Sequence, residues 1–250
     1  MKLLRTSQKW LQSFRRAGLR KKYLDWQKVK ESGIDFAIIR AGFGRFADQK
    51  DENFERNYDE AKAVGVPIGA YWYSYATTVD EAIEEAEVFI SLLSGKQFEY
   101  PLFFDQEEQS AFETGKENCS KMVRAFCDVL EAKGYWAGLY TSRSYLESYI
   151  EDVIKERYAL WIAEWGSRLN YNGSVGIWQY SEKGYVNGIT GNVDLDICYM
   201  DYPSIIKEKG LNGYGKEEIP QTTPEPASND GITIEITVDG KKYSGKLNMT

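Results

Sequence analysis

Two carboxylates one residue apart, Asp105 and Glu107, end the segment Pro101-Leu102-Phe103-Phe104-Asp105-Gln106-Glu107. A short apolar run between a Tyr-Pro pair and a polar segment predicts a buried strand. Side chains alternate along a strand, so both acids should point to the same side. Two acids held together there repel each other, and their pKa values are expected to separate, leaving one protonated and one ionised. Such a pair suits general acid catalysis at a glycosidic bond, although an ordinary solvated strand end would show the same spacing.

The composition narrows the chemistry further. The chain has 250 residues and no histidine, which excludes Ser-His-Asp and Cys-His catalysis and nearly all histidine-based metal sites. A net charge of -7 argues against nucleic acid as a partner, and no apolar run approaches the ~20 residues of a membrane span. Three widely spaced cysteines indicate reduced core residues. We therefore expect no metal and no cofactor, and acid-base chemistry carried by Asp, Glu, Tyr or Lys.

Short apolar runs alternate with amphipathic segments from Asp25 onward, which predicts a parallel sheet covered by helices. Capping boxes at Thr78 and Thr114 mark the expected starts of two of these helices. Strands are expected at residues 36–40, 68–75, 102–107, 136–141, 159–165, 176–180 and 193–199. An eight-stranded barrel needs one more strand before Asp25, and residues 2–6 are the candidate.

The expected fold is thus an α/β, irregular TIM-like barrel whose first strand is atypical or missing. In such barrels the site lies at the carboxyl ends of the strands. Eight residues with polar or aromatic side chains fall at those ends: Tyr73, Asp105, Glu107, Tyr140, Glu164, Trp165, Gln179 and Tyr180. The high aromatic content, 14%, suits stacking on sugar rings as well as packing in a core.

The chain divides into four segments that differ in composition and residue pattern. Residues 1–24 are basic, with eight Lys or Arg and no acid, and lack the apolar stretch of a secretory signal. Residues 25–205 form the expected barrel, and residues 206–230 read as a polar linker containing Gly and Pro. Residues 231–250 predict a β-hairpin, because Asp239-Gly240 separates two alternating runs. Two strands alone are marginal in water, so the hairpin should dock, self-associate or begin a further module.

Several motifs resemble the lysozymes of glycoside hydrolase family 25, the muramidases found among phage endolysins and bacterial autolysins. Residues 25–42, from Asp25-Trp26 to Ala41-Gly42, are similar to the family's first helix and second strand. Gly69-Ala70-Tyr71-Trp72-Tyr73 resembles its third strand, and Asp105-Gln106-Glu107 its catalytic Asp-x-Glu. Trp178-Gln179-Tyr180 and residues 188–196 resemble its closing segment. The motifs follow the family order over roughly residues 25–202.

The resemblance implies an irregular eight-stranded barrel that hydrolyses the β-1,4 bond between N-acetylmuramic acid and N-acetylglucosamine in bacterial peptidoglycan. It assigns Glu107 as the general acid. Asp105 would hold the substrate acetamido group or stabilise an oxocarbenium-like transition state. Asp194 would complete the acidic floor of the cleft, with Asp196 as the competing choice because it shares the same face.

The resemblance also indicates substrate-binding residues, each of which has a structural alternative. Arg40 would steer a carboxylate or orient an acid, and a structural salt bridge would explain it equally well. The remaining candidates would line the sugar cleft or fill the core: Tyr71, Tyr73, Tyr140, Trp161, Trp178 and Gln179.

One departure concerns the family's first strand, Gly-Ile-Asp-Val-Ser, whose Asp is a further active-site acid. The first 24 residues here contain no acid, and Arg5 would stand at that position if residues 2–6 were the strand. Two hypotheses follow: an active muramidase, or a cell-wall glycan-binding protein derived from one with impaired catalysis. A chitinase-like glycosidase fits Asp-x-Glu but not the closing Val-Asp-Leu-Asp. Without a signal, the protein is expected to stay cytoplasmic until released, like an endolysin, or to act outside the cell at the wall.

Overall fold

The structure is a computed structural model that describes residues 11–12, 24–215, 232–238 and 241–247. The chain divides into a compact unit that ends at Lys216 and a second unit, Glu217–Thr250. Each unit is described by itself. The first unit extends beyond residue 205, where the sequence predicted the linker to begin, since residues 202–214 still fold and pack.

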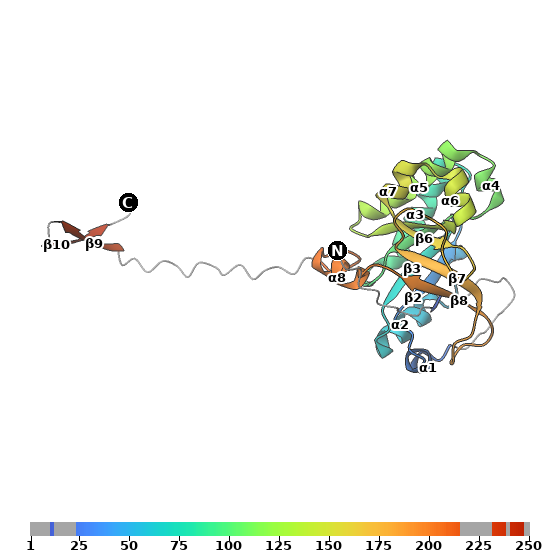
Figure 1. Cartoon of the computed structure of the whole chain (residues 1–250), viewed down its shortest axis with the longest axis horizontal. Helices are drawn as coiled ribbons and strands as arrows, with labels where there is room; N and C mark the ends of the chain where they lie inside the picture. Colours follow the sequence, from blue (N-terminus) through green and yellow to red (C-terminus); the bar gives the residue numbers. More distant parts are fainter. Residues whose placement is uncertain (1–10, 13–23, 216–231, 239–240, 248–250) are drawn as a thin grey trace. The chain divides into compact units, whose positions relative to one another are not determined.

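Eight strands in sequence order form the sheet of the first unit (Figure 1). They are β1 (Leu11–Gln12), β2 (Ala37–Phe43), β3 (Ile68–Tyr73), β4 (Leu102–Asp105), β5 (Ala137–Ser142), β6 (Ala159–Ala163), β7 (Ile177–Gly184) and β8 (Val193–Cys198). Neighbours are parallel except for β7 and β8, which are antiparallel. Strand β1 is hydrogen-bonded to β2 and also lies beside β8, so the sheet curls back on itself. This confirms the irregular TIM-like barrel.

Helices pack against the sheet and connect its parallel strands as far as β6 (Figure 1), whereas residues 164–176, between the parallel strands β6 and β7, contain no helix. They are α1 (Trp26–Glu31), the 3-10 helix η1 (Ala47–Gln49), α2 (Phe54–Val64), α3 (Val79–Leu93), α4 (Gln109–Phe112), α5 (Lys116–Glu131), α6 (Arg143–Tyr149), α7 (Asp152–Arg157) and α8 (Tyr202–Glu208). Within the described ranges, none of these helices has the length and apolarity to cross a bilayer. The short helices α4, α7 and α8 were not predicted, because they lack the apolar periodicity of longer helices.

The two predicted capping boxes have different outcomes. Thr78 caps α3 as predicted, and its side chain accepts a hydrogen bond from the Glu81 N–H at 3.2 Å. The prediction at Thr114 was wrong, because α5 is capped by Gly115, whose φ of 92° is left-handed. The Thr114 hydroxyl instead donates to the carbonyl of Ala111 at 2.6 Å, at the end of α4. The unpredicted helix therefore uses the side chain that the motif had assigned to α5.

The first strand also differs from expectation. The candidate segment, residues 2–6, lies outside the described residues, and the strand that pairs with β2 is Leu11–Gln12. Leu11 pairs with Ala37 and Gln12 with Ile38, at the start of β2. The first strand is therefore present but only two residues long, as an atypical strand rather than a missing one.

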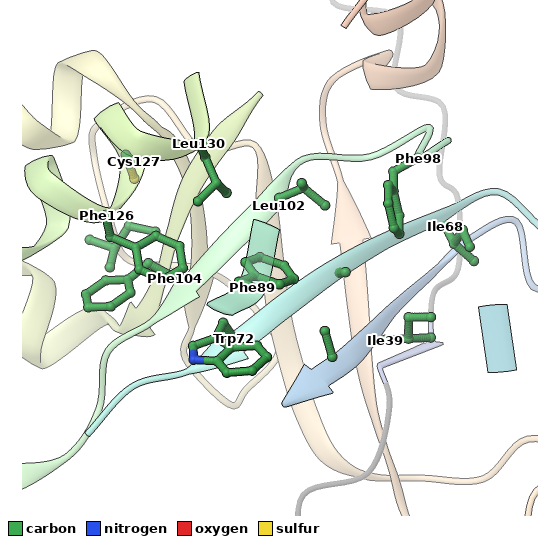
Figure 2. Close-up of a cluster of buried hydrophobic side chains, with 14 of the residues drawn as sticks. Ile39, Ile68, Trp72, Phe89, Phe98, Leu102, Phe104, Phe126, Cys127 and Leu130 are labelled. Carbon is green, nitrogen blue, oxygen red and sulfur yellow. The ribbon is translucent and has the colours of Figure 1, made fainter. Parts of the chain in front are cut away.

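Side chains of the sheet divide into two buried layers, as alternation along strands requires. Between the sheet and the helices, the rings of Trp72 and Phe89 stack with centroids 5.5 Å apart, and those of Phe104 and Phe126 lie 4.5 Å apart (Figure 2). Inside the barrel, a second cluster gathers Tyr71, Phe103, Tyr140 and Trp161 with other apolar side chains. This inner layer lies beneath the carboxyl ends of the strands and supports the side chains at those ends.

A buried carboxylate closes the opposite, amino-terminal end of the barrel. Glu99 is 7% exposed and accepts hydrogen bonds from Lys62, from the Tyr214 hydroxyl and, at 3.0 Å, from the Ile68 N–H. Burial raises the pKa of Glu99, but these donors outweigh burial and hold the pKa below its usual range. The ionised form is therefore the one that the fold stabilises.

Glu99→Gln is expected to lower the free energy of unfolding by about 1.5–3 kcal/mol at neutral pH, because the variant loses a charged acceptor. Since the folded-state pKa of Glu99 is lowered, its stabilisation is present above the unfolded-state value of about 4.3 and is lost as pH falls through the folded-state value. Urea unfolding of both proteins at neutral and acidic pH checks this. A difference that persists unchanged in acid would contradict it.

The second unit contains the predicted hairpin. Strands β9 (Ile232–Val238) and β10 (Lys241–Leu247) are antiparallel, with Val238 paired to Lys241 and Ile232 to Leu247. This register leaves two residues for the turn, as the Asp-Gly signal predicts. Docking and self-association of the hairpin stay predictions, and the turn residues themselves lie outside the described ranges.

Candidate active site

The two acids of the Asp-x-Glu segment follow directly from the end of β4. Asp105 is the last residue of β4, is fully buried, and pairs with Tyr73 of β3 and Tyr140 of β5. Its carbonyl oxygen accepts from the Ser74 N–H at 3.0 Å, and the Gln106 N–H donates to the Tyr140 carbonyl at 3.0 Å. Glu107 is half-buried. The backbone on both sides of β4 therefore fixes where these acids enter the edge of the barrel.

Gln106 lies between the two acids and is 1% exposed. By alternation its side chain points away from the face that Asp105 occupies, toward the helices. Neither its amide nitrogen nor its amide oxygen makes a hydrogen bond within the part of the chain that the structure describes. A buried amide in this state costs about 1–3 kcal/mol.

Gln106→Met is therefore expected to raise the free energy of unfolding by about 1–3 kcal/mol, since it keeps the side-chain length and removes the unsatisfied polar atoms. Denaturant unfolding checks this prediction. Gln106→Glu is the matched control and should destabilise, because it buries a carboxylate in the same place. A loss of stability in the Met variant would show that the amide has partners in solution.

A third acid, Glu108, belongs to the same edge and was not among the predicted site residues. The hydroxyl of Tyr73, at the end of β3, donates a hydrogen bond to Glu108 Oε1. Tyr73 thus connects the neighbouring strand to the segment that follows Glu107. The acidic run Glu107-Glu108 was visible in the sequence, but nothing in the spacing indicated which of the two would contact a neighbouring strand.

The closing strand β8 contributes two more acids on one face. Asp196 pairs with Gln179 of β7, is fully buried, and accepts a hydrogen bond from Trp161 Nε1 at 2.7 Å. Burial raises the pKa of Asp196 well above its usual range, the Trp161 bond lowers it, and the charge of Asp194 raises it again. Asp194 is half-buried. Since β8 runs antiparallel to β7, Asp194 lies nearer the carboxyl-end rim and Asp196 deeper in the barrel.

Gln179 connects two aromatic residues of the edge. Its Oε1 accepts from the Tyr140 hydroxyl at 3.2 Å and from Trp165 Nε1 at 3.0 Å. Tyr140 is buried, whereas Trp165 is 59% exposed. An exposed indole whose nitrogen is fixed by a buried amide can offer its ring as a flat apolar surface. Trp165 lay among the strand-end residues in the sequence, but only the structure shows this anchoring.

The segment that carries Trp165 is held by its neighbour Glu164. The Glu164 carboxylate accepts from the backbone and side-chain amides of Asn170, both at 2.7 Å, and forms an ion pair with Arg143 at 2.9 Å. Trp178 Nε1 donates to the Glu164 carbonyl at 2.8 Å. Trp178 alternates with Gln179 along β7, so its side chain lies on the opposite face of the strand.

The remaining residues predicted to bind substrate differ in burial and in their contacts. Tyr71 and Trp161 are 0% exposed, inside the barrel beneath the edge, where they pack as the core alternative requires. Arg40 forms the ion pair that was its structural alternative, with its Nη2 2.7 Å from Asp51 Oδ2. Burial lowers the pKa of Arg40, but the neighbouring Tyr71, Asp51 and Asp105 raise it above its usual value. Arg40 therefore stays charged and near the acidic edge.

The described residues show no group of three or more Cys, Asp or Glu side chains arranged to hold a metal ion. Their carboxylates instead contact tryptophan, tyrosine, arginine and amide donors. The edge thus combines several acids of different burial with an exposed indole. Such a set can supply a proton and a negative charge beside a bound sugar.

Comparison with known proteins shows to which family the chain is similar. The family model of the Glycosyl hydrolases family 25 matches residues 20–189. The autolytic lysozyme of Clostridium acetobutylicum is 34% identical over 174 residues, which cover 69% of this chain and 51% of that protein. Lysozyme M1 of Streptomyces globisporus is 26% identical over 186 residues, covering 68% of this chain and 62% of that protein. The chain spans about half to two thirds of the length of these relatives.

Solved structures agree in fold. The family 25 glycosyl hydrolase of Bacillus anthracis has a TM-score of 0.65 at 22% identity, over 86% of this chain and 96% of its own. The modular autolysin LytC of Streptococcus pneumoniae, solved with a synthetic peptidoglycan ligand, has a TM-score of 0.67 at 23% identity, over 77% of this chain and 46% of its own. At these identities the likeness concerns the barrel itself.

Proposed function

The chain belongs to glycosyl hydrolase family 25, and from that premise we propose that it hydrolyses the β-1,4 bond between N-acetylmuramic acid and N-acetylglucosamine in peptidoglycan. The observation that supports this most directly is the geometry of β4, which ends in buried Asp105 and continues into half-buried Glu107 at the carboxyl edge of the barrel. The family's lysozymes and the peptidoglycan complex of a structural neighbour make peptidoglycan the substrate class to test.

Glu107 takes the general acid role in this proposal, protonating the oxygen of the leaving sugar. Asp105, whose carbonyl accepts from the Ser74 N–H and whose neighbour Gln106 donates to the Tyr140 carbonyl, supplies negative charge near the anomeric carbon or holds the acetamido group. Asp194, at the rim of β8, is the third acid of the floor. Arg40, Tyr73, Tyr140 and Gln179 position substrate or neighbouring acids.

The burial of the aromatic residues indicates which of them can contact the sugar and which support the site. Trp161 and Tyr71 lie below the floor and support it, whereas the exposed indole of Trp165 is available to stack on a sugar ring. Trp178, on the other face of β7, supports the segment that carries Trp165 through its bond to Glu164. Substrate contact is thus assigned to the exposed residues and support to the buried ones.

A second candidate function is wall binding with impaired catalysis. The observation that favours it is the absence of any acid among the first 24 residues, so β1 cannot supply the carboxylate that the family's first strand provides. The two candidates share the same cleft and the same ligand. They differ in whether the glycosidic bond breaks.

One assay decides between them. Purified peptidoglycan is incubated with the protein, and the released reducing ends are counted and then reduced with borohydride. Release of ends that yield muramitol supports the muramidase, whereas ends that yield glucosaminitol would place the cut at the other glycosidic bond. Wall binding without new reducing ends would support the binding protein. Cleavage of chitin in preference to peptidoglycan would overturn both.

A further inference from the structure

The segment between β3 and α3, residues 74–78, borders the candidate catalytic edge. The Ser74 N–H donates to the carbonyl of Asp105 at 3.0 Å. The ring of Tyr75, which is half exposed, packs edge-on against the rings of Tyr73 and Phe43, with centroids 5.1 and 6.0 Å apart. The segment therefore joins the end of β4 to the exposed ring of Tyr75, which rests on two half-buried rings.

Two carboxyl groups one turn apart on α3 hold this segment. Glu81 Oε2 accepts from the Thr77 N–H at 2.9 Å and from the Thr77 hydroxyl at 3.0 Å. Glu85 Oε1 accepts from the Tyr75 N–H at 2.9 Å. Both acids also line a pocket of about 220 Å³, together with Gly44, Arg45, Phe46, Gln49, Tyr75 and Ala76.

The two acids differ in their surroundings. Glu81 pairs with Arg45 of the β2–η1 connection at 2.9 Å, and the same guanidinium lies 3.7 Å from Glu84. Glu85 is 1% exposed and forms no ion pair within residues 24–215. From α5, the uncharged amide of Asn118 approaches the segment and donates to the Thr77 carbonyl at 2.9 Å.

Burial raises the pKa of Glu85 to about 7, although the Ser74 hydroxyl and the N–H groups of Tyr75 and Ala76 lower it, and the charge of Glu81 acts in the same direction as burial. The Arg45 cation, which could oppose this, is held by Glu81 and Glu84. A buried carboxylate without a counter-ion is costly, so an ionised Glu85 favours conformations that expose it to water. In this protein, such exposure requires movement of the segment that Glu85 holds.

We propose that Glu85 is a positioning residue of the catalytic edge, and that its neutral carboxyl group keeps residues 74–78, and with them Tyr75 and the end of β4, in place. The proposal rests on the proposed hydrolase function for its activity readout. Glu85 contacts neither substrate nor the reacting atoms and acts through Tyr75 and Ser74. Because its raised pKa favours the neutral form below about 7, the segment should lose this support as pH rises through that value.

Glu85→Gln provides the decisive variant, since the amide oxygen can accept from the Tyr75 N–H and the side chain cannot ionise. The ratio of variant to wild-type kcat/KM isolates Glu85, because every other side chain is the same in both proteins. The ratio should be near one at about pH 6 and rise to roughly tenfold at about pH 8, as a single group of pKa near 7 dictates. A ratio that stays flat across this range would overturn the proposal.

Two further variants separate positioning from packing. Glu85→Leu removes the acceptor and should lower kcat at every pH while wall binding is retained. Phe89→Leu, a change in a fully buried residue on the same helix, is the packing control and should leave kcat unchanged. An equal loss of kcat in both variants would assign Glu85 a purely structural role.

Hydrogen exchange tests the positioning role of Glu85 without relying on the proposed hydrolase activity. The amide of Tyr75 should exchange faster in the wild type at about pH 8 than at about pH 6, after correction for intrinsic exchange, and should not do so in Glu85→Gln. If the wild type releases no reducing ends but shows this difference, the hydrolase function fails and the positioning role stands. Equal protection in both proteins at both pH values would overturn the positioning role alone.

Discussion

Glu107→Gln is expected to lower kcat for release of reducing ends from peptidoglycan by about 10²–10⁴-fold, the range typical of a lost general acid. The amide keeps the shape of the side chain but cannot deliver a proton to the leaving oxygen. Because Glu107 is only half-buried, two residues beyond the end of β4, and the amide keeps its size, the fold should tolerate the change. The variant should therefore still bind cell walls and unfold at the same denaturant concentration as the wild type.

The matched control for this prediction is Glu113→Gln. Glu113 is an exposed acid at the end of α4 whose side chain accepts from Gln109 at 2.9 Å, so its neutralisation removes a similar charge from the same region. Its activity should equal that of the wild type. Retention of activity in Glu107→Gln would show that another acid, such as Asp105 or Glu108, donates the proton. Equal losses in both variants would indicate an effect of overall charge.

Alternation along a strand explains why the position of Asp105 and Glu107 at the end of a buried strand could be predicted from the sequence. Asp105 and Glu107 follow a run of three apolar residues. Such a run is readily assigned to a buried strand, and the end of that strand then determines where the two acids lie. The same logic gave the inner face of β8, which carries Asp194 and Asp196. The order of strands up to β6 followed from the alternation of strands and helices, because parallel neighbours need long connections that are usually helical, whereas β6 and the parallel β7 are joined without a helix.

Depth within the barrel could not be predicted in the same way. Asp194 and Asp196 share a face, and only the antiparallel pairing of β8 with β7 shows that Asp196 is the deeper of the two. The contact between Trp165 and Gln179 joins residues from adjacent strands whose register the sequence does not specify. Thr114 was assigned to the wrong helix because the four residues of α4 have too little periodicity to be recognised.

The difference in depth leads to a prediction about Asp196. Its folded-state pKa is raised well above the usual value by burial, so the folded state binds a proton that the unfolded chain releases above about pH 3.9. For an acid shifted in this direction, stability falls as pH rises from the unfolded-state pKa toward the folded-state pKa. Asp196 therefore destabilises the fold at neutral pH, and a neutral side chain of the same shape should relieve this.

The substitution Asp196→Asn supplies a neutral side chain of the same shape, and its amide oxygen can still accept a hydrogen bond from Trp161 Nε1. The variant should be more stable than the wild type at neutral pH, by a margin that grows by up to about 1.4 kcal/mol per pH unit above the unfolded-state value and vanishes in acid. Urea unfolding over a pH series measures this margin. Activity should be retained, whereas Asp194→Asn, at the rim, should lose it. If Asp196→Asn is instead inactive and less stable, Asp196 is the ionised acid of the floor and the assignment to Asp194 is wrong.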